Sequence, residues 1–238
     1  MTDTAENTAD TTEYRQHRFR LPPGATDILL VRHGESQPAR AGMEFPTKNG
    51  HADPPLDAHG HHEAQCVAAR LANEDIAAIY VTPLQRTAQT AAPLADKLGL
   101  EPLVEPDLQE VFLGEWEGAT FRVRVSEGHP LAKQLWEEQR WDVIPGAESM
   151  AALAERVERG LNRIAAAHPD QRVVVFTHGG IIGTVMGLAT GGRTFAFVGA
   201  DNASISHIVV SDGTWILRRF NDTGHLATDL DRPSDPLM

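Results

Sequence analysis

Cysteine is nearly absent from the sequence, which contains only Cys66 among its 238 residues. A single cysteine excludes disulfides within the chain and fits a reducing compartment. Long apolar runs are absent as well, because no stretch reaches the ~20 apolar residues of a membrane-spanning helix. The polar N-terminal segment also lacks the apolar stretch of a secretory signal. These absences predict a cytoplasmic protein that does not enter a membrane.

Lysine is scarce, because only three of the 21 basic residues are lysines, at Lys48, Lys97 and Lys133. Against 33 acidic residues these leave a formal net charge of −12. Binding nucleic acid without regard to sequence needs a basic face that displaces counterions, so this charge argues against a nucleic-acid partner. A small basic pocket is still compatible with it, and the positions of individual arginines must reveal one.

Short apolar runs alternate with helical patterns along the chain. The runs predict strands at 27–31, 76–81 and 173–176, and the patterns predict helices at 60–71, 84–98, 131–141 and 149–168. A final hairpin is predicted at 204–220. Such alternation is typical of an α/β protein with helices on both faces of a sheet. We expect one domain at 27–226, between a disordered polar tail at 1–26 and a second tail at 227–238.

Two of the predicted buried strands end on a histidine that is followed by glycine, at His33-Gly34 and His178-Gly179. If the strands are parallel, both histidines lie at the carboxyl edge of the sheet, where open α/β sheets bind ligands. A helix that begins at Gly179 would add free backbone N–H groups and the positive end of its dipole. Either histidine alone fits a structural role, but the pair predicts an anion site.

Two arginines fall close to the same edge. Arg32 precedes His33, and Arg86 lies in the first turn of the helix that follows the Thr82-Pro83 turn. The guanidinium fork matches the oxygens of a phosphoryl group. Arg86 alone would be interpreted as a solvated helix residue. Together with the histidines, the two arginines favour a phosphoryl site.

Five blocks of sequence occur in the order found in the histidine phosphatase superfamily. They are Arg32-His33-Gly34-Glu35-Ser36, residues 82–90, residues 108–118, Pro145-Gly146-Ala147-Glu148-Ser149, and Thr177-His178-Gly179. The chain resembles the phosphoglycerate-mutase-like branch of that superfamily over about residues 27–226. The resemblance implies a three-layer α/β/α sandwich with a mostly parallel central sheet. It also implies a phosphomonoesterase that acts on a small phosphorylated metabolite through a phosphohistidine.

The resemblance gives each residue at the sheet edge a role. His33 corresponds to the nucleophile that takes the phosphoryl group. Arg32, Arg86 and His178 correspond to the groups that clamp the phosphoryl oxygens. Gly179 adds a backbone donor to this clamp.

Two acids of the third block are candidates for the proton donor. Glu110 resembles the family residue that protonates the leaving alkoxide and later takes a proton from water. Glu117 is the reserve candidate, and a solvated surface acid is the alternative for both. Because arginine and histidine stand where Mg²⁺ would act, the resemblance implies no metal and no cofactor.

Two positions bear on the choice between phosphatase and mutase. Cofactor-dependent mutases of the family carry a tyrosine-glycine block after the glutamate and an asparagine-serine pair after the second histidine. Here Glu110 is followed by Val111-Phe112, and His178 by Gly179-Gly180. These differences favour a phosphatase, with a mutase and a non-catalytic module that recognises a phosphorylated partner as alternatives.

Four histidines, His51, His59, His61 and His62, invite the hypothesis of a metal site. The sequence around His62 lacks the second histidine of an H-E-x-x-H motif, so a polar helix start is favoured.

Segments 37–56 and 119–144 are expected to cover the pocket. Their candidates for apolar walls are Phe45, Phe121, Trp136 and Trp141, and their candidates for anion contacts are Arg40, Arg122 and Arg124. The pair Trp136 and Trp141 fits either anchors in the core or a contact in a homodimer.

Overall fold

The computed structural model describes residues 14–16, 18–40 and 42–226. The tails expected at 1–26 and 227–238 therefore lie largely outside the described residues. A six-stranded sheet in the order β5-β4-β6-β1-β7-β8 forms the centre. Strands β5, β4, β6 and β1 are parallel, whereas β7 is antiparallel to both β1 and β8. None of the described helices combines the length and the apolar character that a membrane span requires.

The strands and helices have the following bounds. The strands are β1 (Thr26–Arg32), β2 (Thr47–Lys48), β3 (His51–Ala52), β4 (Ala78–Val81), β5 (Leu103–Val104), β6 (Arg172–Thr177), β7 (Ile205–Ser211) and β8 (Thr214–Asp222). The helices are α1 (Ala58–Leu71), α2 (Gln85–Leu98), α3 (Thr120–Ser126), α4 (Pro130–Glu138), α5 (Met150–Ala167) and α6 (Gly179–Thr190). Single 3₁₀ turns lie at Pro106–Leu108, Gly114–Trp116, Trp141–Val143 and Thr194–Ala196.

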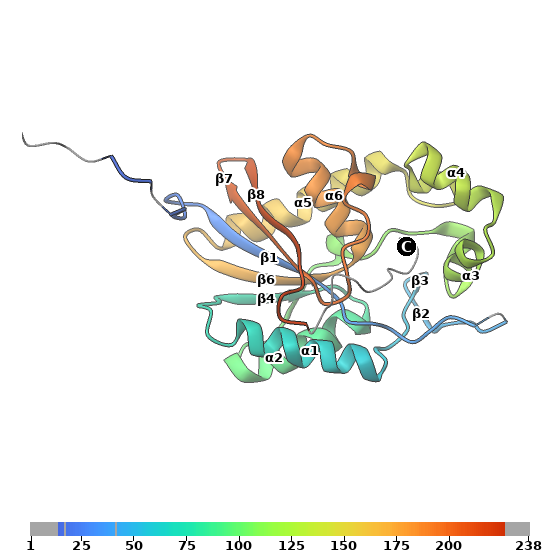
Figure 1. Cartoon of the computed structure of the whole chain (residues 1–238), viewed down its shortest axis with the longest axis horizontal. Coiled ribbons are helices and arrows are strands. Elements are labelled where there is room, and N and C mark those ends of the chain that lie inside the picture. Colours follow the sequence, from blue (N-terminus) through green and yellow to red (C-terminus); the bar gives the residue numbers. More distant parts are fainter. Residues whose placement is uncertain (1–13, 17, 41, 227–238) are drawn as a thin grey trace, which may run out of the picture.

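Helices cover both faces of the sheet (Figure 1). Helices α1 and α2 lie on one face and α5 and α6 on the other, while α3 and α4 extend past the sheet beside β2 and β3. Alternate residues of β1 enter different cores: Ile28 and Leu30 join the core on the α5 and α6 side, and Leu29 and Val31 join the other. Each such burial contributes about 1.5–3 kcal/mol. Burial on both faces explains why β1 is an unbroken apolar run, and the predicted sandwich is confirmed.

Helix ends follow from individual side chains. Asp57 caps α1 by accepting the Gly60 N–H at 2.8 Å, and Ser149 caps α5 by accepting the Ala152 N–H at 3.2 Å. Gly99 ends α2 and Gly191 ends α6, both in the left-handed conformation that glycine adopts without a steric penalty. Ser149 is thus the N-cap of α5, a position at which serine is strongly preferred.

The expected helix at 131–141 is too long. Helix α4 ends at Glu138 because Gln139 adopts a positive φ of 56°, and Trp141 lies in a separate 3₁₀ turn. The segment 119–144, which was expected to cover the pocket, also contains helix α3, and the sequence pattern did not predict this helix separately. Strands β2, β3 and β5 have two residues each, too few to display an alternating pattern.

The loop after β1 packs directly on the start of α1. A Cβ on Gly60 would lie 2.1 Å from the Glu35 carbonyl oxygen, and one on Gly34 would lie 2.5 Å from the Gly60 carbonyl oxygen. The Glu35 N–H also donates to the Glu63 carboxylate at 2.7 Å. Helix α1 therefore determines the path of the chain immediately after His33.

Replacing Gly60→Ala should lower the free energy of unfolding by about 1–3 kcal/mol, because the added methyl group meets backbone that cannot move aside. Urea denaturation followed by circular dichroism measures the change. His61→Ala is the matched control, since His61 is the next residue of α1 and is exposed. Equal midpoints for the two variants would contradict the close packing.

Candidate active site

His33 and His178 lie side by side at the carboxyl edge of the sheet. Strands β1 and β6 pair in register as far as Arg32 and Thr177, and the His33 N–H donates to the Thr177 carbonyl at 2.9 Å. The two imidazole centroids are 5.2 Å apart. Both side chains are buried, with His33 at 4% and His178 at 0% exposure. The paired strands thus bring together the two histidines that the sequence placed at one edge.

The surroundings of His33 suit a nucleophile. Its Nδ1 lies 2.7 Å from the Gly34 carbonyl oxygen, which can only accept, so we assign the proton to Nδ1 and the free lone pair to Nε2. Burial holds the pKa of His33 well below its ordinary value, and the charges of Arg86 and Arg32 lower the pKa further. The imidazole is therefore neutral near pH 7.

Arg86 and Arg32 bring two cations to the site, of which Arg86 is buried and Arg32 is partly buried. Arg86 lies in the first turn of α2 and donates to the Ala52 carbonyl at 2.9 Å. Burial lowers the pKa of Arg86 to about 10, which keeps it charged at neutral pH. Arg32 donates to the Ala200 carbonyl, and its Nε has no hydrogen-bond partner among the described residues. A guanidinium has five N–H donors, so both arginines keep donors for a ligand.

His178 is the N-cap residue of α6, where free backbone N–H groups begin. Its Nε2 lies 2.9 Å from the Thr82 hydroxyl, which in turn lies 3.1 Å from the Thr87 hydroxyl. Burial holds the pKa of His178 well below its ordinary value, and Arg86 lowers it further. Thr82 and Thr87 were visible in the second sequence block, but their spacing alone did not reveal that Thr82 orients His178.

Glu110 is a partly buried acid in the same cavity as the arginines. Its Oε1 accepts the Val111 N–H at 2.9 Å. Burial raises the pKa of Glu110, although Arg86 and Arg32 act in the opposite direction. A Cβ on Gly180 would lie 2.7 Å from Glu110 Oε1, so the glycine leaves room for the carboxyl group. Glu110 can therefore hold a proton above the usual range of a carboxylic acid.

Glu117, the reserve candidate for the proton donor, uses its carboxylate to bind backbone N–H groups. Its Oε2 accepts the Ala52 N–H at 2.7 Å and its Oε1 accepts the Leu113 N–H at 2.9 Å. Both oxygens thus hold backbone in place. This arrangement favours Glu110 over Glu117 as a proton donor.

A cavity of about 600 Å³ opens at this edge. Its lining includes Arg32, His33, Arg86, Glu110 and Gly179. Phe45, Phe121 and Trp141 are among its apolar walls, and Glu35, Ser36, Arg122, Asp201 and Asn202 are among its polar walls. His178 does not line the cavity, because it lies fully buried beside His33.

Comparison with known proteins identifies the family. The family model described as histidine phosphatase superfamily (branch 1) matches residues 28–223. The chain belongs to this superfamily.

Individual relatives agree with the family match. Phosphoglycerate mutase-like protein 4 of Arabidopsis thaliana is 35% identical over 207 residues, which cover 84% of this chain and 86% of that protein. The metal-independent phosphoserine phosphatase of the same plant is 31% identical over 207 residues, covering 85% of this chain and 84% of that protein. Among solved structures, the α-ribazole phosphatase of Shigella flexneri has 26% identity and a TM-score of 0.66, over 82% of this chain and 96% of that one.

Arg122 is the cavity cation whose position sequence alone could not decide. In this member of the histidine phosphatase superfamily it donates to the Ser36 hydroxyl at 2.7 Å and to the Gln37 carbonyl at 3.0 Å. Burial lowers the pKa of Arg122, and the charge of Arg32 lowers it further. Arg40 and Arg124 instead line a separate hollow, so their proposed contact with the main cavity is wrong.

The four histidines of the suggested metal cluster are dispersed. His51 lies in the cavity, 3.8 Å from Glu117. His59 lies on α1, where its Nδ1 is 3.2 Å from Glu35. Among the residues that the structure describes, no group of three or more His, Cys, Asp or Glu side chains could hold a metal ion. The metal-site hypothesis therefore has no support in this region.

The two tryptophans pack inside the chain. Trp141 is 5% exposed, and its ring centroid is 4.9 Å from that of Phe195. Trp136 packs on the same phenylalanine at 5.6 Å. Both serve the core, as one of the two sequence interpretations held, and the homodimer remains a prediction.

Replacing Arg86→Met should raise the pKa of His33, because a methionine fills similar space without the positive charge that disfavours the imidazolium. Arg122→Met should raise it less, since Arg122 has a smaller effect on His33. Nitrogen NMR of ¹⁵N-histidine-labelled protein across a pH series measures both values. Arg219→Met, on the exposed part of β8, is the control. An unchanged or lower pKa in Arg86→Met would contradict this electrostatic account.

Proposed function

We propose that the chain is a phosphomonoesterase that hydrolyses a small phosphorylated metabolite through a phosphohistidine on His33. The observation that supports this most directly is the geometry of His33. Its Nδ1 is tied to the Gly34 carbonyl, which leaves Nε2 as the free nitrogen, and the side chain lines a cavity together with Arg32 and Arg86. A neutral nucleophile beside fixed cations is what attack on a phosphate dianion requires.

In the first step, Nε2 of His33 attacks phosphorus and the bond from phosphorus to the ester oxygen breaks. Glu110 gives its proton to the departing oxygen, and its raised pKa keeps that proton available. In the second step, water attacks the phosphohistidine and its proton passes to the Glu110 carboxylate. Phosphate leaves, and both residues return to their starting states.

The charge that spreads over the phosphoryl oxygens is balanced by Arg32 and Arg86, and the neutral His178 can add a hydrogen bond from Nδ1, which has no partner among the described residues. The N–H groups at the start of α6, including that of Gly179, add donors to the same region. Loss of one such donor typically slows catalysis by about 10²–10³-fold. Arg32 and Arg86 supply the charge that Mg²⁺ supplies in many other phosphoryl-transfer enzymes.

The relatives support a phosphatase of small molecules. Two of the three proteins compared are named as phosphatases, of phosphoserine and of α-ribazole phosphate. A cavity of about 600 Å³ has the size of a site for a small ligand. Phosphoglycerate mutase activity is the second candidate, because one relative is named mutase-like. If the protein converts 3-phosphoglycerate only in the presence of 2,3-bisphosphoglycerate, the result would favour the mutase.

The broader setting is part of the same proposal. Residues 27–226 form the catalytic domain, and the reaction takes place in the cytoplasm, a compartment that fits a chain with one cysteine. With a net charge of −12, nucleic acid is not expected among its partners.

His33→Ala should abolish turnover of p-nitrophenyl phosphate and of a panel of sugar phosphates, phosphoserine and phosphoglycerates, with a loss on the order of 10⁴-fold or more. Release of inorganic phosphate measures the rate, and circular dichroism checks the fold. After rapid quenching at alkaline pH, ³²P from labelled substrate should remain on the wild type alone. Equal background rates of phosphate release from the wild type and from His33→Ala would refute the proposed enzymatic activity. Retained phosphate binding without a trapped phosphohistidine would favour the non-catalytic module.

Wild-type activity should be unchanged by EDTA and should not rise with added Mg²⁺ or Mn²⁺, because Arg32 and Arg86 supply the positive charge. Initial rates of phosphate release after dialysis against chelator provide the measurement. Activity that EDTA removes and a divalent ion restores would overturn the metal-free mechanism.

A further inference from the structure

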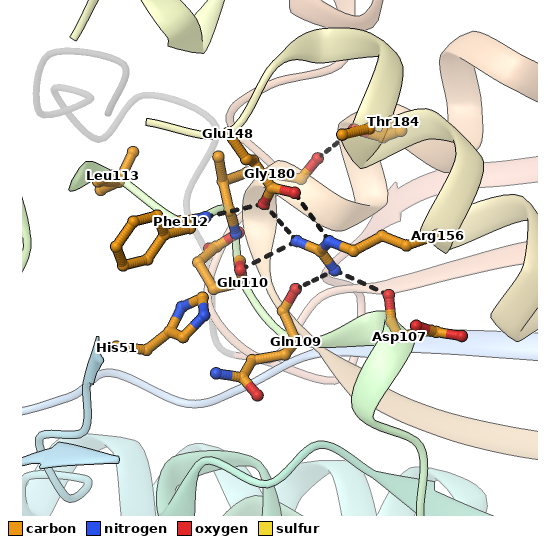
Figure 2. A network of polar contacts seen from close by, with 12 residues as sticks. His51, Asp107, Gln109, Glu110, Phe112, Leu113, Glu148, Arg156, Gly180 and Thr184 are labelled. Atoms are coloured by element: carbon orange, nitrogen blue, oxygen red, sulfur yellow. Dashed lines mark hydrogen bonds and ion pairs between the residues drawn. The ribbon is translucent and has the colours of Figure 1, made fainter. Parts of the chain in front are cut away.

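Arg156 of α5 uses every one of its N–H groups to hold the segment that carries Glu110 (Figure 2). Its Nε donates to Glu148 Oε2 at 2.9 Å, and its Nη1 donates to the carbonyls of Asp107 and Gln109, both at 2.7 Å. Its Nη2 donates to the Glu110 carbonyl at 3.1 Å and to Glu148 Oε1 at 2.6 Å. The five donors of the guanidinium are thereby all satisfied.

Glu148 holds the backbone on the C-terminal side of Glu110, so that together with Arg156 it forms a frame of hydrogen bonds around this residue. Its Oε1 accepts the Phe112 N–H at 2.8 Å, and its own N–H donates to the Phe112 carbonyl at 3.0 Å. The ion pair is largely shielded, with side-chain exposures of 17% for Arg156 and 15% for Glu148. Backbone on both sides of Glu110 is thus tied to one buried pair.

The segment needs such a frame because it has no regular structure of its own. A 3₁₀ turn ends at Leu108, and residues 109–113 belong to no helix or strand. Buried carbonyl groups outside regular structure require partners from elsewhere. Arg156 supplies a partner to two of them, at Gln109 and Glu110, and also to the Asp107 carbonyl of the 3₁₀ turn. Glu110 itself fits closely against Gly180. The position of the carboxyl group therefore depends on bonds made about two helix turns into α5.

We infer that Arg156 is a positioning residue that, together with Glu148, sets where the Glu110 carboxyl group meets the leaving oxygen. This inference rests on the proposed function, in which Glu110 is the proton donor. Arg156 is absent from the cavity lining, so it acts through Glu110 rather than on the substrate. A misplacement of about 1 Å in such a group can slow a reaction by about 10²-fold.

The effect is one of geometry more than of charge. The positive charge of Arg156 is balanced by its partner Glu148 at 2.6 Å. Burial is the largest cause of the raised pKa of Glu110, and the charges that act most strongly on it are those of Arg86 and Arg32. Removing Arg156 should therefore displace the acid without changing its charge at neutral pH.

Two substrates separate positioning from general damage. p-Nitrophenolate is a good leaving group that departs with little help from an acid, whereas the alkoxide of glycerol 3-phosphate needs a proton. Arg156→Met should lower kcat/KM for glycerol 3-phosphate by about 10–100-fold, since general acids contribute about 10²–10⁴-fold. The kcat/KM for p-nitrophenyl phosphate should fall by less than about threefold, because this constant covers only the steps up to transfer of the phosphoryl group to His33 and not the later proton transfer from water to Glu110. Arg156→Lys keeps the positive charge but loses the forked guanidinium geometry. Its rate on glycerol 3-phosphate should therefore lie between those of the wild type and Arg156→Met.

Arg159→Met is the matched control. Arg159 lies on the same helix and pairs with the Asp107 carboxylate at 3.0 Å, but its side chain is 51% exposed. An exposed pair of this kind contributes little to stability. Its loss should change neither rate.

Two further measurements test whether the loss of rate in the Arg156 variants acts through Glu110. The double variant Arg156→Met with Glu110→Gln should be no slower on glycerol 3-phosphate than Glu110→Gln alone, because the same proton transfer is lost in both. Guanidinium ion added to Arg156→Ala at non-denaturing concentration should restore part of the rate on glycerol 3-phosphate. Should Arg156→Met be insoluble, Arg156→Lys provides the same comparison of substrates.

The outcomes are distinct. In an active enzyme, equal losses on the two substrates, additive losses in the double variant, or an Arg159→Met effect as large as that of Arg156→Met would overturn the positioning role. A wild type inactive on both substrates would instead overturn the proposed function, and this inference with it.

Discussion

The parallel pairing of β1 with β6 is the constraint on which the site depends. Their register runs from Asp27 opposite Arg172 to Arg32 opposite Thr177, and the bond from the His33 N–H to Thr177 continues it beyond the strands. A slip of one residue would turn every side chain of β1 to the other face of the sheet. Because both faces of β1 are packed into cores, the register that buries the strand also brings the two imidazoles together.

Burial acts in opposite directions on the groups gathered there. It disfavours whichever form is charged, so it lowers the pKa of His33 and raises the pKa of Glu110. The two arginines reinforce the first effect and moderate the second. One environment thus disfavours the protonated form of the histidine and favours the protonated form of the acid.

The elements that position the site could be predicted because their signals are long or strongly patterned. Buried strands β1 and β6, the cap at Ser149 and the helix that starts at Gly179 all have local causes. The roles of Arg122 and Arg156 could not be predicted in this way. Each depends on contacts between segments distant in the chain, such as the 46 residues between Arg156 and Glu110, and residues 109–113 have no periodic pattern from which to place them.

The peptide unit of Ala52 joins the outer wall of the cavity to its base. Its carbonyl accepts from Arg86, and its N–H donates to Glu117 in the segment that leads into α3. The wall beyond the sheet includes Ala52 of β3 and Phe121, Arg122 and Val123 of α3. A change in this wall that moves the peptide of Ala52 therefore also removes the carbonyl that holds the Arg86 guanidinium. The shape of the outer wall and the position of the cation at the base of the cavity cannot vary independently.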